Sequence, residues 1–365
     1  MLKLCCVNSI QSSKTINALF YHVQSTDLRH KRVNSKKSVP MNRKWKHELF
    51  RSENGCVKGK RNYKLLSYNI LAQDLLVEHL QLYYGIDNKM LRWQSRLSKL
   101  KDEIGILAPD IMCLQEMQYD HLKELVNQFG IAKQNSRLEY VFKKKTGTRS
   151  DGCVIIYDKN KFKLIEEKNV EYYTDDVSTL NRENIAVMVK FQPLEDNSST
   201  FVVATTHLLY NPRREDVRIS QVNKLIQEII EFSNTPQSID MKNRLPVILT
   251  GDFNFTPDTK AFELLTGLRK PKLRPENCEA VQSVGDFFQM DAIDFGMDNG
   301  ASTYQDQWIT VDYILKSKSN RDKKSIQITS KYKLPSTDQC WRSGKIPNKF
   351  VGSDHFSLAI QFSIV

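Results

Sequence analysis

The chain has 365 residues, of which 40% are hydrophobic, so it can form one large domain or two small ones. It contains no run of eighteen apolar residues, and we therefore expect no membrane-spanning helix. The seven cysteines are scattered, odd in number and free of C-x-x-C spacing, which argues against a disulfide framework or a zinc site and favours a reducing compartment.

The net charge of +12 is concentrated at the N-terminus. Residues 1–60 hold 13 lysines and arginines against 3 acidic residues and so carry +10 of the total. Residues 1–26 lack acidic residues, which is typical of a mitochondrial presequence, but they also lack arginine, and a disordered leader fits equally well. The basic run 29–37 fits a solvated linker or a nuclear signal. We predict a disordered basic leader over 1–60 and a cytoplasmic protein, with mitochondrial or nuclear targeting as alternatives.

From Tyr63 onward, short apolar strands alternate with amphipathic helices. Apolar residues at helical spacing predict helices over 91–107 and 217–232. Strands are predicted at 64–71, 110–116, 153–157, 185–191, 201–207, 245–252, 310–315 and 356–364. Many strands with few helices indicate two sheets packed face to face with helices outside, forming one domain over 61–365.

Polar side chains stand where these apolar strands end. They are Asn69, Glu116, His207, Asp252 with Asn254, Asp312, and Asp354 with His355. Taken singly, an Asp or Asn after a strand is usually a turn former, and a lone histidine is usually a surface residue. Because strand ends lie at the rim of a sheet, the whole set can converge on one site.

The acidic members of this set suit a hard divalent cation. Magnesium takes carboxylate oxygens and keeps most of its waters, so one or two acidic ligands suffice. We predict that Glu116 binds Mg²⁺ (or Mn²⁺), with Asn69 and Asp354 nearby. Such a cation assists phosphodiester hydrolysis by stabilising the charge that builds up on the phosphorus centre.

The remaining members suit proton transfer and phosphate binding. Asp252 can orient or deprotonate the attacking water, helped by the amide of Asn254. His355, polarised by Asp312, can donate to the phosphate oxygens, and His207 provides a second donor. The combination predicts metal-assisted phosphoryl chemistry.

The order and spacing of these segments resemble the DNase I-like endonuclease/exonuclease/phosphatase superfamily. The matching segments are SYNIL (67–71), LQE (114–116), THL (206–208), GDFN (251–254), VDYI (311–314) and SDH (353–355). The resemblance covers roughly residues 60–365 and implies a four-layer α/β/β/α sandwich of two mixed sheets flanked by helices. It also implies that the polar strand ends occupy catalytic and metal positions, with His207 as an additional phosphate-binding histidine.

Further segments resemble the carbon-catabolite-repression deadenylase and nocturnin group, and within it the Angel proteins. They are SYNILAQDLL (67–76), SDGC (150–153), NRENIAVMV (181–189), THLLYNPRREDVR (206–218), ITVDYI (309–314) and NRKW (42–45). This resemblance implies action on RNA 3′ ends, by 3′–5′ exonuclease chemistry or by phosphatase chemistry on terminal 2′,3′-cyclic phosphates. The leucine-rich repeat by which some deadenylases join a larger complex is not found in residues 1–60.

Candidate substrate-binding residues follow from the same resemblance. Pro212 matches the proline on one face of the terminal base, and Asn211 lies beside it. The aromatic on the other face has no certain register in the stretch 304–308, which speaks against a poly(A) preference but not against base stacking. Independently of the resemblance, Arg182 and Asn184 lie beside an apolar strand and are stronger candidates for the RNA channel than the lysine run 143–145. The stretch 316–324 is predicted to be a solvated loop.

Exonuclease and cyclic phosphatase stay open as alternatives, as do base preference, the number of metal ions and the oligomeric state. A phosphatase for a small molecule such as an inositol phosphate is a second hypothesis, because one fold hosts many functions. A catalytically inactive binding module is a third, and the complete polar set argues against it.

Overall fold

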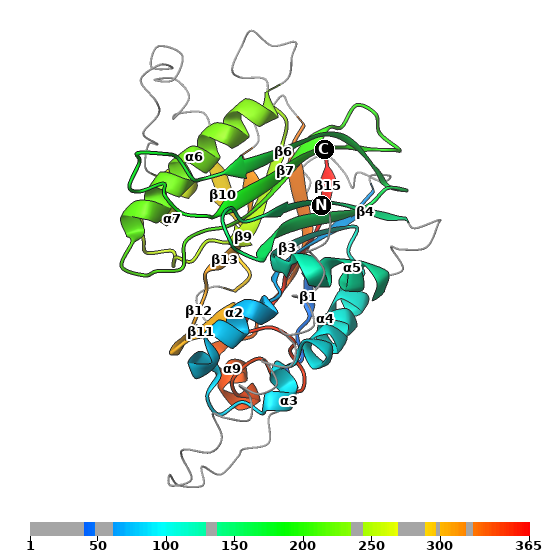
Figure 1. The fold of residues 1–365 in the computed structure, drawn as a ribbon. Coiled ribbons are helices and arrows are strands. Elements are labelled where there is room, and N and C mark those ends of the chain that lie inside the picture. The colour runs from blue at the N-terminus through cyan, green and yellow to red at the C-terminus, as the bar shows by residue number, and fades with distance from the viewer. Residues whose placement is uncertain are drawn as a thin grey trace, which may run out of the picture.

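A computed structural model of the chain describes residues 40–47, 61–128, 137–234, 244–268, 289–296, 300–318 and 324–365, and within these ranges two mixed β-sheets pack face to face (Figure 1). The first sheet has seven strands in the order β1 (Trp45–His47), β14 (Ile326–Tyr332), β15 (Leu358–Ile364), β2 (Tyr63–Asn69), β3 (Ile111–Gln118), β5 (Asp151–Asp158) and β4 (Leu138–Lys144). The second has six strands in the order β10 (Met290–Ala292), β13 (Asp312–Ser317), β9 (Val247–Asp252), β8 (Phe201–His207), β7 (Ile185–Pro193) and β6 (Phe162–Glu171).

Each sheet has one parallel pair near its centre. Strands β2 and β3 run parallel in the first sheet, and β8 and β9 run parallel in the second. A short hairpin of β11 (Thr303–Gln305) and β12 (Gln307–Ile309) stands apart from both sheets. Because the two strands of a parallel pair end on the same side of the sheet, residues that follow these strands are placed next to one another.

Helices cover the outer face of each sheet (Figure 1). The first sheet is covered by α4 (Trp93–Leu107) and α5 (Tyr119–Gln128), and the second by α6 (Glu215–Ser233) and α7 (Lys260–Leu265). Four short helices lie at one end of the molecule: α2 (Gln73–Glu78), the 3₁₀ helix η1 (Leu80–Tyr83), α3 (Asn88–Leu91) and α9 (Thr337–Ser343). None of the helices within the described ranges is long and apolar enough to cross a lipid bilayer.

The alternation of side chains explains the layers. On β8, Phe201 and Val203 enter the core between the two sheets, whereas Val202 and Ala204 pack under α6. All four are fully buried, because the strand has apolar neighbours on both faces. The predicted four-layer α/β/β/α sandwich of two mixed sheets is confirmed.

The N-terminal boundary of the fold differs from the prediction. Residues 45–47, which we placed in a disordered leader over 1–60, form strand β1 and pair with β14. Arg43, just before it, donates to Glu103 and Ser357 and lies over the ring of Tyr332. A three-residue strand is too short to show a period in the sequence, and its partners lie nearly 300 residues away. The predicted targeting segments at 1–26 and 29–37 lie outside the described residues.

Other differences concern strands with little apolar character. Strand β6 is largely exposed at the sheet edge. Its sequence, FKLIEEKNVE, is too rich in charged residues to predict a strand. The predicted solvated loop at 316–324 is wrong at its start, because Lys316 and Ser317 complete β13; residues 319–323 lie outside the described ranges.

Candidate active site

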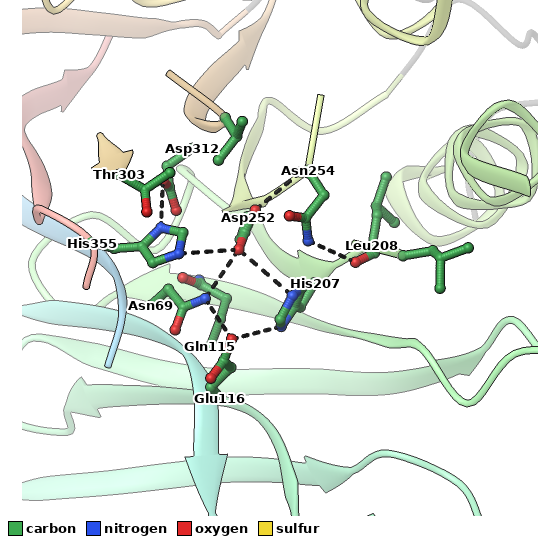
Figure 2. A network of polar contacts seen from close by, with 12 residues as sticks. Asn69, Gln115, Glu116, His207, Leu208, Asp252, Asn254, Thr303, Asp312 and His355 are labelled. Carbon is green, nitrogen blue, oxygen red and sulfur yellow. Dashed lines mark hydrogen bonds and ion pairs between the residues drawn. The ribbon is translucent and has the colours of Figure 1, made fainter. Parts of the chain in front are cut away.

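Strand pairing brings the predicted residues together at one end of the two sheets (Figure 2). In the second sheet, the parallel register places His207 beside Asp252, and the antiparallel register places Asp252 opposite Asp312. In the first sheet, Asn69 stands beside Gln115, directly before Glu116. Residues separated by up to about 290 positions therefore converge because each ends or follows a strand.

Glu116 reaches the site through a backbone irregularity in β3. The pairing of β3 with β5 shifts register between Leu114 and Met117, and Glu116 has a left-handed φ of 56°. This conformation is unfavourable for a residue with a side chain, by about 1–3 kcal/mol, and persists only where surrounding contacts impose it. Two contacts do so here: the Glu116 carboxylate accepts from Asn69 Nδ2 at 2.9 Å and from the backbone N–H of Ala72 at 3.0 Å.

Asp252 is the centre of the network in Figure 2. Its carboxylate accepts hydrogen bonds from Asn69 Nδ2 and from the backbone N–H of Asn254, both at 3.0 Å. The Nε2 atoms of His207 and His355 lie 3.6 and 3.7 Å from its Oδ2. Burial, with the nearby Asp312 carboxylate, raises the pKa of Asp252 to about 7. A carboxylate with this pKa can accept a proton at neutral pH, as a general base must.

His355 and Asp312 form a buried ion pair. His355 Nδ1 lies 2.8 Å from Asp312 Oδ2, and both side chains are almost fully buried. Burial alone would lower the pKa of His355, but the Asp312 and Asp252 carboxylates raise it well above its ordinary value. His355 is therefore a fixed cation at neutral pH, with Nδ1 held by Asp312 and Nε2 directed toward Asp252.

His207 has the opposite character. Burial, with Lys145 and His355 nearby, lowers its pKa well below the ordinary value, so the ring is neutral. Its Nδ1 is buried without a hydrogen-bond partner among the described residues and lies 4.0 Å from Glu116 Oε1. The two histidines thus differ in charge although they flank the same carboxylate.

These residues fit a divalent cation. Glu116, His207 and Asp252 each offer a ligand atom within 4.8 Å of the others. Burial and the Asp354 carboxylate raise the pKa of Glu116, and the nearby Lys145 offsets them only in part, so the deprotonated Glu116 carboxylate still lacks full compensating charge. A cation would supply that charge and would also use the unpartnered His207 Nδ1. The second group, Asp252, Asp312 and His355, suits a metal less well because His355 already holds a proton.

Asp354 and Asn254 complete the set. Asp354 is half-buried, and its Oδ2 accepts a 2.7 Å hydrogen bond from the hydroxyl of Tyr83. Asn254 adopts a left-handed φ of 53°, which asparagine tolerates, and its Nδ2 donates to the Leu208 carbonyl. That bond ties the loop after β9 to the loop after β8, next to His207.

The predicted substrate-binding residues occupy different places. Asn211 and Pro212 are exposed on the loop after β8, and buried Arg218 donates to both of their carbonyls. Arg182 is half-buried and donates to the carbonyl of its neighbour Asn181. Asn184 is buried, donates to the His207 carbonyl and accepts from Gln221, so it supports His207 rather than offering its amide to a substrate.

The two aromatic residues of the stretch 304–308 pack against other aromatic side chains of the protein. Tyr304 and Trp308 pair across the β11–β12 hairpin, and Trp308 is buried with its ring stacked on Phe356. Trp308 is therefore not available for stacking on a base. The exposed aromatic on the loop after β8 is Tyr210, two residues before Pro212.

Several residues near the site carry no motif signal. Lys145, the last lysine of the run 143–145, is buried and paired with Asp151 at 2.7 Å, close enough to Glu116 to influence its pKa. Gln115 donates to Thr205 across the two sheets. Tyr83 is the last residue of η1, and the fully buried Arg96 lies on α4.

Comparison with known proteins identifies the family. The sequence profile of the Endonuclease/Exonuclease/phosphatase family matches residues 66–355. "Protein angel" of Drosophila melanogaster is 42% identical over 326 residues, covering 89% of this chain and 87% of the fly protein. "Protein angel homolog 2" of Danio rerio is 35% identical over 217 residues, 59% of this chain, and these span only 37% of the fish protein.

Solved structures agree with this assignment. The structure of ANGEL2, "a 2′,3′-cyclic phosphatase, in complex with adenosine-2′,3′-vanadate", is similar with a TM-score of 0.72 and 25% identity, covering 89% of this chain and 99% of that chain. The human Nocturnin catalytic domain shares the fold, with a TM-score of 0.60 and 20% identity over 88% of this chain and 98% of that chain. The chain is therefore a hydrolase of the endonuclease/exonuclease/phosphatase family and belongs to its Angel group.

Proposed function

We propose that the chain is a magnesium-dependent phosphoesterase acting on RNA 3′ ends, and that it processes terminal 2′,3′-cyclic phosphates at least as fast as it degrades a 3′-hydroxyl end. One observation carries the proposal: the protonated His355 lies beside Asp252, whose pKa is about 7. Together with Glu116 and His207, Asp252 also forms the group that could bind a cation. The choice of an RNA end is supported by the similarity to ANGEL2 and by the Angel-group sequence.

The side chains divide the work of hydrolysis. Asp252 orients a water molecule and takes its proton as the water oxygen bonds to phosphorus. His355 donates from Nε2 to a phosphate oxygen, and Asp312 keeps that ring protonated and oriented. A Mg²⁺ ion held by Glu116 and its neighbours would supply Lewis-acid stabilisation of the phosphate charge.

Opening a cyclic phosphate needs fewer contacts with the base than exonucleolysis does. The water–phosphorus bond forms as one ribose oxygen leaves with a proton, and hydrolysis of the resulting monoester then releases inorganic phosphate. Both steps take place at a phosphate that is attached to the last ribose. Progressive exonucleolysis instead requires the terminal base to be held while the preceding phosphate lies over the metal. Trp308 is buried, which supports a weak base clamp here.

A gel time course with end-labelled RNA tests the proposal. Two RNAs of equal length are compared with Mg²⁺ present, one ending in a 2′,3′-cyclic phosphate and one being a 3′-hydroxyl oligo(A), and inositol polyphosphate is assayed in parallel by phosphate release. We expect the cyclic end to react at least as fast as oligo(A), and the inositol compound to be inert. Pro212→Ala is expected to slow the oligo(A) reaction more than the cyclic one.

Two site variants and one control make the result specific. Asp252→Ala and His355→Ala should abolish both RNA reactions, because both need the same water and phosphate contacts. Glu139→Gln, which alters an exposed carboxylate on the edge strand β4, should leave them unchanged. A ladder from oligo(A) with the cyclic end untouched would place the chain with the deadenylases, and turnover of the inositol compound alone would favour a small-molecule phosphatase.

A further inference from the structure

Tyr83 reaches the active site from a segment that none of the catalytic motifs includes. Residues 73–91 form α2, η1 and α3 between β2 and α4, and they pack around a small apolar cluster of their own. The ring of Tyr83 belongs to that cluster with Leu76 and Leu91, and only 7% of the residue is exposed. Its hydroxyl lies at the edge of this cluster and donates a hydrogen bond to Asp354 Oδ2 at 2.7 Å.

The backbone that carries Asp354 is held independently of Tyr83. Arg96 is fully buried, and its guanidinium donates to the carbonyls of Ile70 and Leu71 at 2.9 Å and of Gly352 at 3.2 Å. One side chain thus ties the loop after Asn69 to the loop before Asp354. Ser353 strengthens the same junction, because its hydroxyl donates to the Asn69 carbonyl at 2.6 Å.

With the backbone fixed, the remaining freedom of Asp354 lies in its side-chain torsions. Within the described ranges the Tyr83 hydroxyl donates to this carboxylate at 2.7 Å, whereas the Ser353 hydroxyl lies 3.4 Å from it and gives its single proton to the Asn69 carbonyl. The hydrogen bond from Tyr83 therefore determines how the carboxylate is turned. The Asp354 carbonyl is held separately by Thr303 Oγ1, also at 2.7 Å.

We propose that Tyr83 is a positioning residue that sets the orientation of the Asp354 carboxylate and thereby tunes cation binding at the site. The proposal rests on the proposed function, since it takes Asp354 as a ligand near Glu116. Partners of this kind commonly change metal affinity by about 10–100-fold when removed, because the ligand must then be oriented at the moment of binding.

Tyr83→Phe tests the proposal, since it removes one hydroxyl and keeps the ring in its cluster. Tyr157→Phe is the matched control: Tyr157 is also a buried tyrosine, and it donates to a carboxylate, Glu139 Oε2, at 2.9 Å on the edge strand away from the site. Mn²⁺ binding to the full chain without RNA is measured by titration with paramagnetic detection of free ion, alongside the thermal midpoint and kcat.

We expect Tyr83→Phe to weaken Mn²⁺ binding about tenfold and to raise the Mg²⁺ concentration for half-maximal activity by a similar factor. Tyr157→Phe should leave both unchanged. Equal Mn²⁺ affinity in Tyr83→Phe and wild type overturns the proposal, as does an equal loss in both variants or a wild type that binds no Mn²⁺. A wild type that binds Mn²⁺ but leaves a cyclic RNA end intact contradicts the proposed function alone, because the binding comparison needs no RNA.

Discussion

Replacing Asp312 by asparagine should convert His355 from a fixed cation into a neutral ring. The pair is buried, with 2.8 Å between His355 Nδ1 and Asp312 Oδ2, and the variant keeps the shape of the side chain while removing its charge. Removing one partner of a buried pair typically destabilises the folded state by about 3 kcal/mol. The rate should fall by roughly 10²–10⁴-fold, because His355 no longer presents a charged donor to the phosphate.

The stability change should depend on pH in a defined direction. Because the folded-state pKa of His355 is raised, the stabilisation is fully present below its unfolded pKa of about 6.5 and is lost as pH rises through the folded pKa. The difference between wild type and Asp312→Asn should therefore be largest near pH 6 and shrink toward pH 9 and above. Urea unfolding with EDTA present, at several pH values between these limits, measures it without a metal contribution.

Asp110→Asn is a suitable control for this experiment. Asp110 is a buried carboxylate directly before β3, at the opposite end of that strand from Glu116, and it pairs with Lys161. Its replacement should reduce stability by an amount that does not change between pH 6 and 9, because no histidine takes part in the pair, and kcat should be unaffected. A stability difference for Asp312→Asn that stays constant or grows with pH would refute the assignment of a protonated His355.

Further predictions concern the metal, the base and the N-terminus. Glu116→Gln should lower kcat about 100-fold or more, measured at saturating Mg²⁺, and activity that survives EDTA would contradict the metal assignment. The rate should rise between pH 5 and about 7 and then level off, because Asp252 must lose its proton to act as base; a maximum at pH 5 would contradict that role. Deleting residues 1–39 should leave the urea midpoint unchanged, whereas deleting 1–47 should cost about 3 kcal/mol, because it removes the buried Arg43 contacts and β1. Equal stability of the two truncations would show that β1 does not contribute.

The sheets and the catalytic set were predictable because their signals are local and repeated. Each central strand is a continuous apolar run, and each ends in a polar residue, as at His207 and Asp252. Their convergence follows from strand register, which a sequence specifies well where both faces are buried. Edge strand β6 gave no such signal, because the polar run 166–169 interrupts its apolar residues and breaks the alternation that would predict a strand.

The supporting residues could not be found in this way. Arg96 looks like one charge on an amphipathic helix, yet its neighbours Trp93 and Leu97 turn the same face inward, so the guanidinium is enclosed by carbonyls of distant loops. Tyr83 resembles an ordinary core aromatic until the position of Asp354 is known. Asn184 is a candidate for the RNA channel in the sequence because it lies beside an apolar strand, whereas its hydrogen bonds run to protein groups that only the fold brings near.

The central claim is that this site processes a phosphate at the end of an RNA. The most direct measurement is the 3′-end product of an RNA bearing a terminal 2′,3′-cyclic phosphate, incubated with wild type and Mg²⁺ and resolved on a gel beside the Asp252→Ala variant. We predict that wild type removes the cyclic phosphate, leaves the chain length unchanged in the first turnover and releases inorganic phosphate, while the variant leaves the RNA intact. A cyclic end that persists with wild type, under conditions in which Mn²⁺ binds, would contradict the claim.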